Sequence, residues 1–283
     1  MSAPSQSSEA EAAAPALPAR APSASRSQPT GLRRSVDVLV ALTRSDLRAR
    51  YGRGSDRVLK WMLDPVALVG VYLLMVAFVL DRPGEAPGLS LTCAVIPFQL
   101  FMLATIAGLS CVLLRSSIIL NMPFPRTLIP VSSTLTETAA FGASLALVAV
   151  MMIIYGIAPT VAILWLPVVM LVNVLLAVAV SFPAALFGLW FLDLRAFAIN
   201  CSRALFFLAP GIVPLAAVKP NTRGWLELNP LTGLFEAYRS VLLYGKSPPA
   251  WELLYPTAAA ALLLLLFVPL YRKEAPHFAK VLG

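Results

Sequence analysis

Residues 115–130 read RSSIILNMPFPRTLIP and form a short polar interruption between two long apolar stretches of the chain. The interruption contains two arginines, an Asn-Met-Pro-Phe-Pro cluster and no acidic residue. The neighbouring stretches, 91–114 and 128–155, exceed the roughly 20 apolar residues that a membrane-spanning helix needs. We therefore expect this interruption to be a loop between two membrane spans.

The composition of the whole chain supports a membrane protein. Of its 283 residues, 59% are apolar and 13% are charged, against about 45–50% and 25% in soluble domains. The apolar runs are continuous and do not alternate with polar residues, which excludes transmembrane strands. The sequence thus predicts an all-α polytopic membrane protein. Its six transmembrane helices are expected at 63–80, 91–114, 128–155, 161–191, 196–218 and 251–271.

The segments outside the spans differ in character. Residues 1–30 are rich in Ala, Pro and Ser, which predicts a disordered tail without the apolar core of a signal peptide. Residues 31–60 predict an amphipathic basic helix at the membrane interface, either a plain polybasic anchor or a helix that also contacts a partner protein. Within the six-span domain, 61–271, the segment 219–250 carries an amphipathic stripe and predicts a re-entrant or surface helix pair. The basic tail is 272–283.

The distribution of basic residues predicts the orientation. The segments on one side of the predicted membrane, which include both termini and the 115–126 loop, hold 15 Lys and Arg residues, against 5 on the other side. Cytoplasmic segments carry the excess of Lys and Arg in membrane proteins. We therefore expect both termini and the 115–126 loop to lie in the cytoplasm, with the protein in the cytoplasmic membrane.

The sequence offers no recognisable catalytic chemistry. Gly245 to Ser247 resemble the end of a phosphate-binding loop, but position 240 is Ser instead of the required Gly and no strand precedes it. The chain has one histidine, and its three cysteines form no CxxC or Cys/His cluster, so no metal site is expected. We expect no catalytic, cofactor-binding or metal-binding residue and no ATPase site in this chain.

A few polar and aromatic residues fall inside the predicted spans. Glu137 lies about two turns into the third span, where a carboxylate is costly unless it is paired, protonated or in a wet cavity. Gln99 and Glu137 therefore either make hydrogen-bonded helix–helix contacts or have a functional role, in a conduit or in proton coupling. Phe98, Phe101 and Phe141 face lipid or neighbouring helices, or provide the aromatic faces on which sugars stack. These five residues are the candidate substrate conduit.

The ordered set of motifs resembles the permease subunit of type-2 ABC exporters, specifically those that export polysaccharides such as O-antigen, teichoic acid or galactan. The resemblance covers about 32–275. The residues that carry it are Arg48–Tyr51, Leu63–Pro65, Ile96–Phe101, Phe124–Arg126, Ile129–Pro130, Asp193–Arg195, Leu205–Pro210, Pro214, Leu228–Leu231 and Glu236–Arg239.

The resemblance implies a homodimeric permease bound to two copies of a separate ABC ATPase, which would bind ATP and Mg²⁺ itself. The substrate would be a lipid-linked glycan, such as galactan or an O-antigen-like polymer. In such exporters the loop between the second and third spans and the N-terminal helix dock on the ATPase. By position in this chain, the implied ATPase-coupling residues are Arg48, Arg50, Tyr51, Arg115, Asn121, Pro123, Phe124, Pro125 and Arg126.

Two alternatives remain open from the sequence. A drug or small-lipid exporter with the same permease fold would share the coupling loop, so the sequence barely separates it from a polysaccharide exporter. An integral membrane glycosyltransferase or acyltransferase belongs to another class. It would need acids or a histidine clustered at one membrane face, and the sequence has no such cluster.

Overall fold

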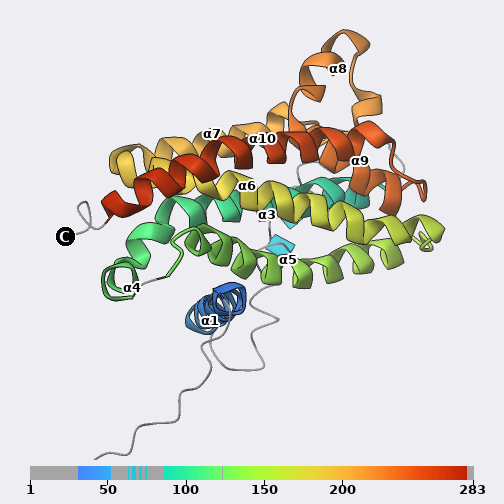
Figure 1. Ribbon diagram of the computed structural model, residues 1–283. Helices are drawn as coiled ribbons and strands as arrows, with labels where there is room; N and C mark the ends of the chain where they lie inside the picture. The colour runs from blue at the N-terminus through green and yellow to red at the C-terminus, as the bar shows by residue number, and fades with distance from the viewer. Residues whose placement is uncertain are drawn as a thin grey trace, which may run out of the picture.

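The computed structural model describes residues 31–51, 63, 66, 67, 70, 71, 74, 86–122 and 124–278, and all regular structure in this part of the chain is helical (Figure 1). Four of these helices are long and apolar enough to cross a membrane. They are α3 (Pro87–Leu114), α5 (Leu128–Ile154), α6 (Leu166–Trp190) with its leading 3-10 turn η2 (Val161–Trp165), and α10 (Ala250–Glu274). The prediction of an all-α, multi-pass membrane protein is confirmed.

The remaining two predicted spans have different outcomes. Most of the first, 63–80, lies outside the described residues, as does the 1–30 tail, so a total of six spans stays a prediction. The fifth, 196–218, is not one continuous helix, because α7 (Arg195–Leu208) ends after 14 residues. At about 1.5 Å per residue, α7 is about 21 Å long, short of the roughly 30 Å hydrocarbon core. Pro210, two residues after the end of α7, has no N–H to continue the helix.

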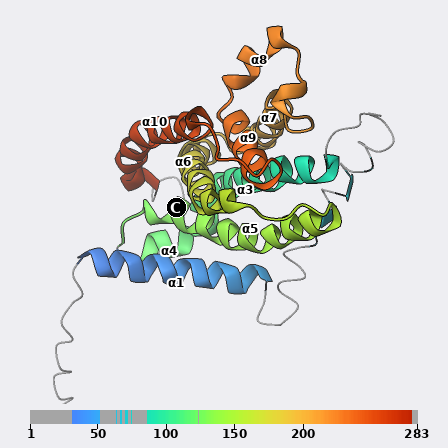
Figure 2. The ribbon, with the colours of Figure 1, turned by 90° about the vertical axis from the view of Figure 1, so that its right-hand side faces the viewer.

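The 219–250 segment forms a pair of unlike helices. Helix α8 (Pro220–Glu227) has no buried residue and projects from the body of the protein, whereas every residue of α9 (Pro230–Leu242) after Pro230 is buried (Figures 1 and 2). Asn229 connects the pair to α7, since its side chain accepts from the backbone N of Leu231 at 3.0 Å and donates to the carbonyl of Leu205 at 2.9 Å. Two helices therefore lie before the last span, although α9 is internal, and their re-entrant or surface character stays a prediction.

Helix α3 lies at the centre of the bundle. It packs on α5 and α6, while α10 covers α6 and α9 (Figure 2). Glycine permits the closest of these contacts: a Cβ on Gly188 of α6 would lie 2.0 Å from the carbonyl oxygen of Leu109 on α3. Small residues are the usual means by which membrane helices bring their backbones together. Gly188 therefore sets the α3–α6 spacing.

Helix α1 (Gly31–Tyr51) runs across the bundle and packs on α5 (Figures 1 and 2). In the view of Figure 2 it runs below α4 (Ser116–Asn121), the short helix that follows α3. The expectation of a helix over this basic segment is confirmed as far as Tyr51, and 52–60 falls outside the described residues. We call this end of the bundle the α4 end and the opposite one, where α9 packs on the start of α3, the α9 end.

Candidate functional site

The polar loop that follows α3 is partly helical. Residues Ser116–Asn121 form α4, and the backbone N of Leu128 bonds the carbonyl of Pro125 at 3.0 Å to begin α5. The loop expected between the two spans is therefore helical over α4. The backbone N–H groups of Ile118 and Ile119 both donate to the carbonyl of Arg115, and these bonds form the first turn of α4. Pro123 lies outside the described residues.

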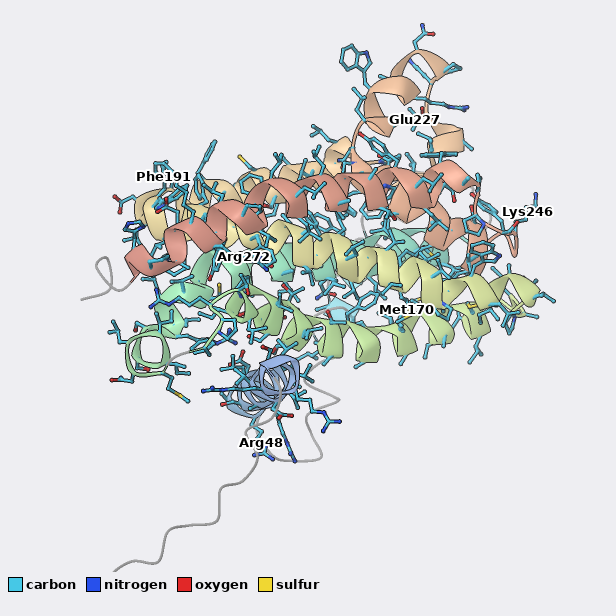
Figure 3. All side chains as sticks on the ribbon, viewed as in Figure 1. Arg48, Met170, Phe191, Glu227, Lys246 and Arg272 are labelled. Atoms are coloured by element: carbon cyan, nitrogen blue, oxygen red, sulfur yellow. The ribbon has the colours of Figure 1, made fainter. Side chains whose placement is uncertain are left out.

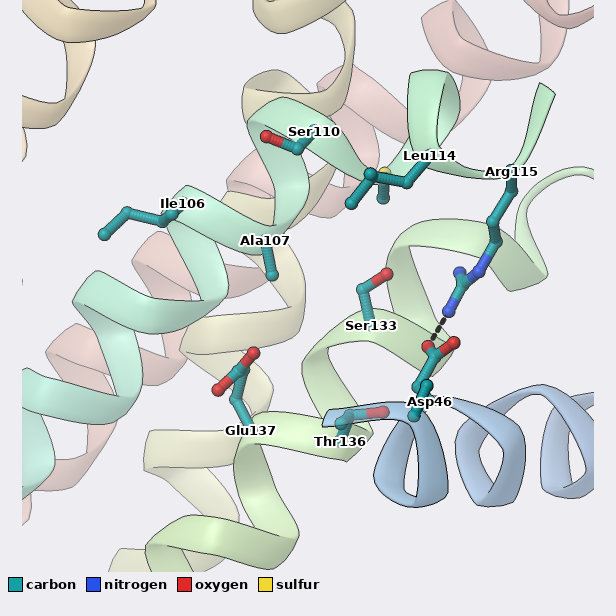
Figure 4. A pocket seen from close by; sticks show the side chains of 11 residues that line it. Asp46, Ile106, Ala107, Ser110, Leu114, Arg115, Ser133, Thr136 and Glu137 are labelled. Atoms are coloured by element: carbon teal, nitrogen blue, oxygen red, sulfur yellow. Dashed lines mark hydrogen bonds and ion pairs between the residues drawn. The ribbon is translucent and has the colours of Figure 1, made fainter. Parts of the chain in front are cut away.

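Arg115 is buried at the junction of three helices. Its guanidinium donates to the carbonyl of Ile129 at 2.8 Å and to the hydroxyl of Ser132 at 2.7 Å, both at the start of α5. It also forms an ion pair with Asp46 of α1 (Figure 4). The resemblance implied that Arg115 contacts a partner protein. In the structure its side chain is instead buried and connects α3 to α1 and α5. A direct contact of Arg115 with a partner stays a prediction.

Arg126 fastens the loop to the last span. Its guanidinium donates to the carbonyl of Ala275, and the hydroxyl of Tyr271 donates to the Arg126 carbonyl at 3.4 Å. Phe124 packs on the same apolar cluster, in which the ring of Tyr271 lies 5.2 Å from that of Phe278. The loop, the start of α5 and the end of α10 therefore form one packed unit.

The other predicted coupling residues lie at the same end but make fewer contacts. Arg48 is exposed on α1 (Figure 3), and Arg50 and Tyr51 belong to the last turn of that helix, where their side chains are not described. Asn121 is exposed and donates to the carbonyl of Ser117 at 2.8 Å, and Pro125 is exposed. The α4 end thus gathers the described members of the predicted coupling set, of which Arg48, Asn121 and Pro125 are exposed.

The predicted conduit residues are distributed over two places. Phe98, Phe101 and Phe141 are buried in the main core, where the Phe98 ring lies 4.9 Å from that of Phe206. Gln99 is half-buried. Glu137 is buried and lines a separate cavity, so the structure does not bring these five residues together, and their role in a conduit stays a prediction.

That cavity has a volume of about 450 Å³ and lies between α1, α3 and α5 (Figure 4). Its polar lining comes from hydroxyl, carboxylate and guanidinium groups, while Ile106, Ala107 and Leu114 make its apolar wall. The polar lining residues are Asp46, Ser110, Arg115, Ser133, Thr136 and Glu137. In the part of the chain that the structure describes, no group of three His, Cys, Asp or Glu side chains could hold a metal ion.

Two residues that sequence reasoning did not select prove central to the packing. Asp46, an acid within a basic helix, is the partner of Arg115. Arg239 is fully buried at the α9 end, although the sequence indicated only a motif there. The sequence feature that could have indicated this buried arginine is an acid and a base three residues apart, Glu236 and Arg239, on an otherwise apolar helical stripe.

Comparisons with known proteins find similarity to membrane permeases. No protein-family model matches the chain. It is similar to the O-antigen export system permease protein RfbA of Myxococcus xanthus, with 26% identity over 246 residues, 86% of this chain and 94% of that protein. It is also similar to the RfbA protein of Klebsiella pneumoniae, with 24% identity over 249 residues, 87% and 95% of the two chains. The resemblance that the motifs indicated is confirmed.

Proposed function

We propose that this chain is the membrane-spanning permease subunit of an ABC exporter that moves a lipid-linked polysaccharide across the cytoplasmic membrane. The observation that carries the proposal is the similarity to O-antigen export permeases over nearly the full length of both chains. A galactan or an O-antigen-like polymer fits the resemblance. The long apolar helices are the transport element, and this chain supplies no catalytic group for the energy step.

The energy comes from a separate ATPase subunit, which binds ATP and Mg²⁺. The excess of Lys and Arg supports a cytoplasmic position for the α4 end and both termini, where such a subunit can reach them. Two ATPase subunits bind a homodimer of this chain. The contact surface on each permease consists of α1, α4 and the segment 124–127, with Arg48, Asn121, Phe124 and Pro125 facing the partner.

The packing explains how a push on this surface reaches the spans. The loop is tied to α1 and α5 through Arg115 and to α10 through Arg126. Packed interfaces of this kind switch between discrete arrangements and do not deform continuously. Closure of the ATPase subunits therefore moves the α4 ends of several helices as a rigid body.

Co-purification tests the proposal. The chain is co-expressed with an ABC ATPase of the same genome and purified, and in a separate experiment cells are depleted of the chain. The expected result is a stable complex and accumulation of lipid-linked glycan on the cytoplasmic side. Purification without any ATPase partner, together with turnover of a lipid-linked sugar, would instead identify a membrane transferase. A complex that exports drugs or small lipids and no glycan would favour the related exporter class.

A further inference from the structure

A pocket of about 510 Å³ lies where the segment 124–127 meets the end of the last span. Phe124, Pro125, Arg126 and Thr127 line one side of it. Arg272, Ala275 and Pro276 line the other, from the end of α10 and the 3-10 turn η5 (Ala275–His277) that follows. Figure 3 places Arg272 at the α4 end of α10. The pocket therefore joins two parts of the chain about 150 residues apart.

The charge of this pocket is positive. Two arginines line it, and no acidic residue is among its lining side chains. Arg126 uses part of its guanidinium on the Ala275 carbonyl, and a guanidinium has five N–H donors in all. Arg272 is exposed. The nearest acid in sequence, Glu274, lies 3.8 Å from the Nδ1 of His277 and does not line the pocket. Donor groups thus remain for an anionic ligand.

The walls of the pocket are held in place before any ligand arrives. Arg126 donates to the Ala275 carbonyl. This carbonyl lies at the C-terminal end of α10, where free carbonyl oxygens would repel an anion, and the bond satisfies it. The ring of Tyr271 packs against Phe278 at 5.2 Å and against Phe182 at 5.5 Å. Proline fixes the backbone φ at 125 and 276. A preformed site loses little conformational entropy when a ligand binds.

We propose that this pocket receives an acidic side chain of the ATPase subunit, so that the end of the last span is part of the coupling surface. The inference rests on the proposed function and extends it to Arg272 and Ala275, which the sequence did not select. Paired arginines on apolar walls match a carboxylate carried on a protein surface, because a guanidinium binds a carboxylate through two parallel N–H···O bonds. A carboxylate seated here contacts the loop before α5 and the end of α10 together.

A titration with matched variants tests this inference. The full chain is placed in nanodiscs of phosphatidylcholine, which removes anionic lipid. The ATPase that co-purifies with the chain is then titrated by fluorescence. Arg272→Glu reverses the charge at the pocket, and Ala275→Trp fills it without a change of charge. Lys273→Glu is the control, since Lys273 is exposed, carries the same charge and does not line the pocket. Size-exclusion chromatography verifies that each variant is folded.

The expected result is an affinity for the ATPase roughly tenfold weaker in Arg272→Glu and in Ala275→Trp, which corresponds to about 1.4 kcal/mol, with less than a twofold change in Lys273→Glu. Equal losses in Arg272→Glu and Lys273→Glu would mean general charge attraction and would overturn the inference. Unchanged affinity for the ATPase in both pocket variants would also overturn the inference. If those variants bound phosphatidylglycerol vesicles more weakly, the pocket would be a site for anionic lipid instead. If the unaltered chain binds no ATPase, the proposed function itself fails.

Discussion

Two buried arginines at opposite ends of α3 hold this protein together in different ways. At the α9 end, Arg239 donates to the carbonyls of Ser90, Pro210 and Gly211 at 2.9–3.2 Å and pairs with Glu236 at 2.7 Å. At the α4 end, Arg115 bonds the start of α5 and pairs with Asp46 of α1. Ser90 and Arg115 are 25 residues apart, which is about 37 Å along a helix.

The difference lies in the carboxylate partners. Glu236 is on the same helix as Arg239, its side chain is 10% exposed, and it also accepts from the backbone N of Leu215 at 2.9 Å. Asp46 belongs to a separate crossing helix, and its side chain is 33% exposed. Water can replace Asp46 at modest cost but has little access to Glu236. We infer that the α9 end is fixed and that the α4 end, where the partner ATPase is proposed to bind, can rearrange.

Loss of the internal arginine gives the largest expected effect. Arg239→Met leaves the Glu236 carboxylate buried without its cation and removes the bonds to three carbonyls. Breaking a buried pair in this way costs about 3–5 kcal/mol of the free energy of unfolding. Thermal unfolding in detergent measures it. Arg223→Met on the projecting helix α8 is the matched control, and an equal loss of stability there would contradict a special role for the α9 end.

Removal of the charge on α1 should have a smaller effect. Asp46→Asn weakens the tie to Arg115, and because Asp46 is a third exposed the expected loss is about 1 kcal/mol. The loss should be local, with faster amide hydrogen exchange in α1 and little change in α9. Asp37→Asn, an exposed acid on the same helix, is the control. Slower exchange in α1, or a loss as large as that of Arg239→Met, would remove the contrast between the two ends.

The smallest effect on stability is expected from the exposed coupling surface. Arg48→Ala should change the free energy of unfolding by less than about 0.5 kcal/mol, as for most surface substitutions. Its affinity for the ATPase should nevertheless fall. Arg203→Ala on α7, which is also exposed, should leave both quantities unchanged. Unaltered ATPase binding in Arg48→Ala would remove α1 from the coupling surface.

Sequence reasoning predicted the helical class and all four long described spans, because a long apolar run has few alternatives to a helix in a bilayer. It also recognised a helix pair before the last span. It could not predict that α7 stops at Leu208, since hydropathy continues through Pro210 and Pro214 while helical hydrogen bonding does not. The periodicity of apolar residues indicates which face of a helix is apolar, but not which helices pack against that face.

The site was predicted less completely than the fold. The loop and the basic helix were placed correctly in sequence, but the burial of Arg115 depends on Asp46, 69 residues away. The contact between Arg126 and Ala275 spans 149 residues. Pairings over such distances arise from tertiary packing and leave no local pattern in a single sequence.

The central claim is that energy enters this permease through the loop at the α4 end, and coupled export tests it most directly. Proteoliposomes with the permease and its ATPase are assayed for ATP hydrolysis and glycan export in the same sample, with the double variant Phe124→Ala and Arg126→Ala beside the unaltered chain. The double variant should remain a folded dimer and retain hydrolysis while it loses export. Export at the unaltered rate would contradict the account.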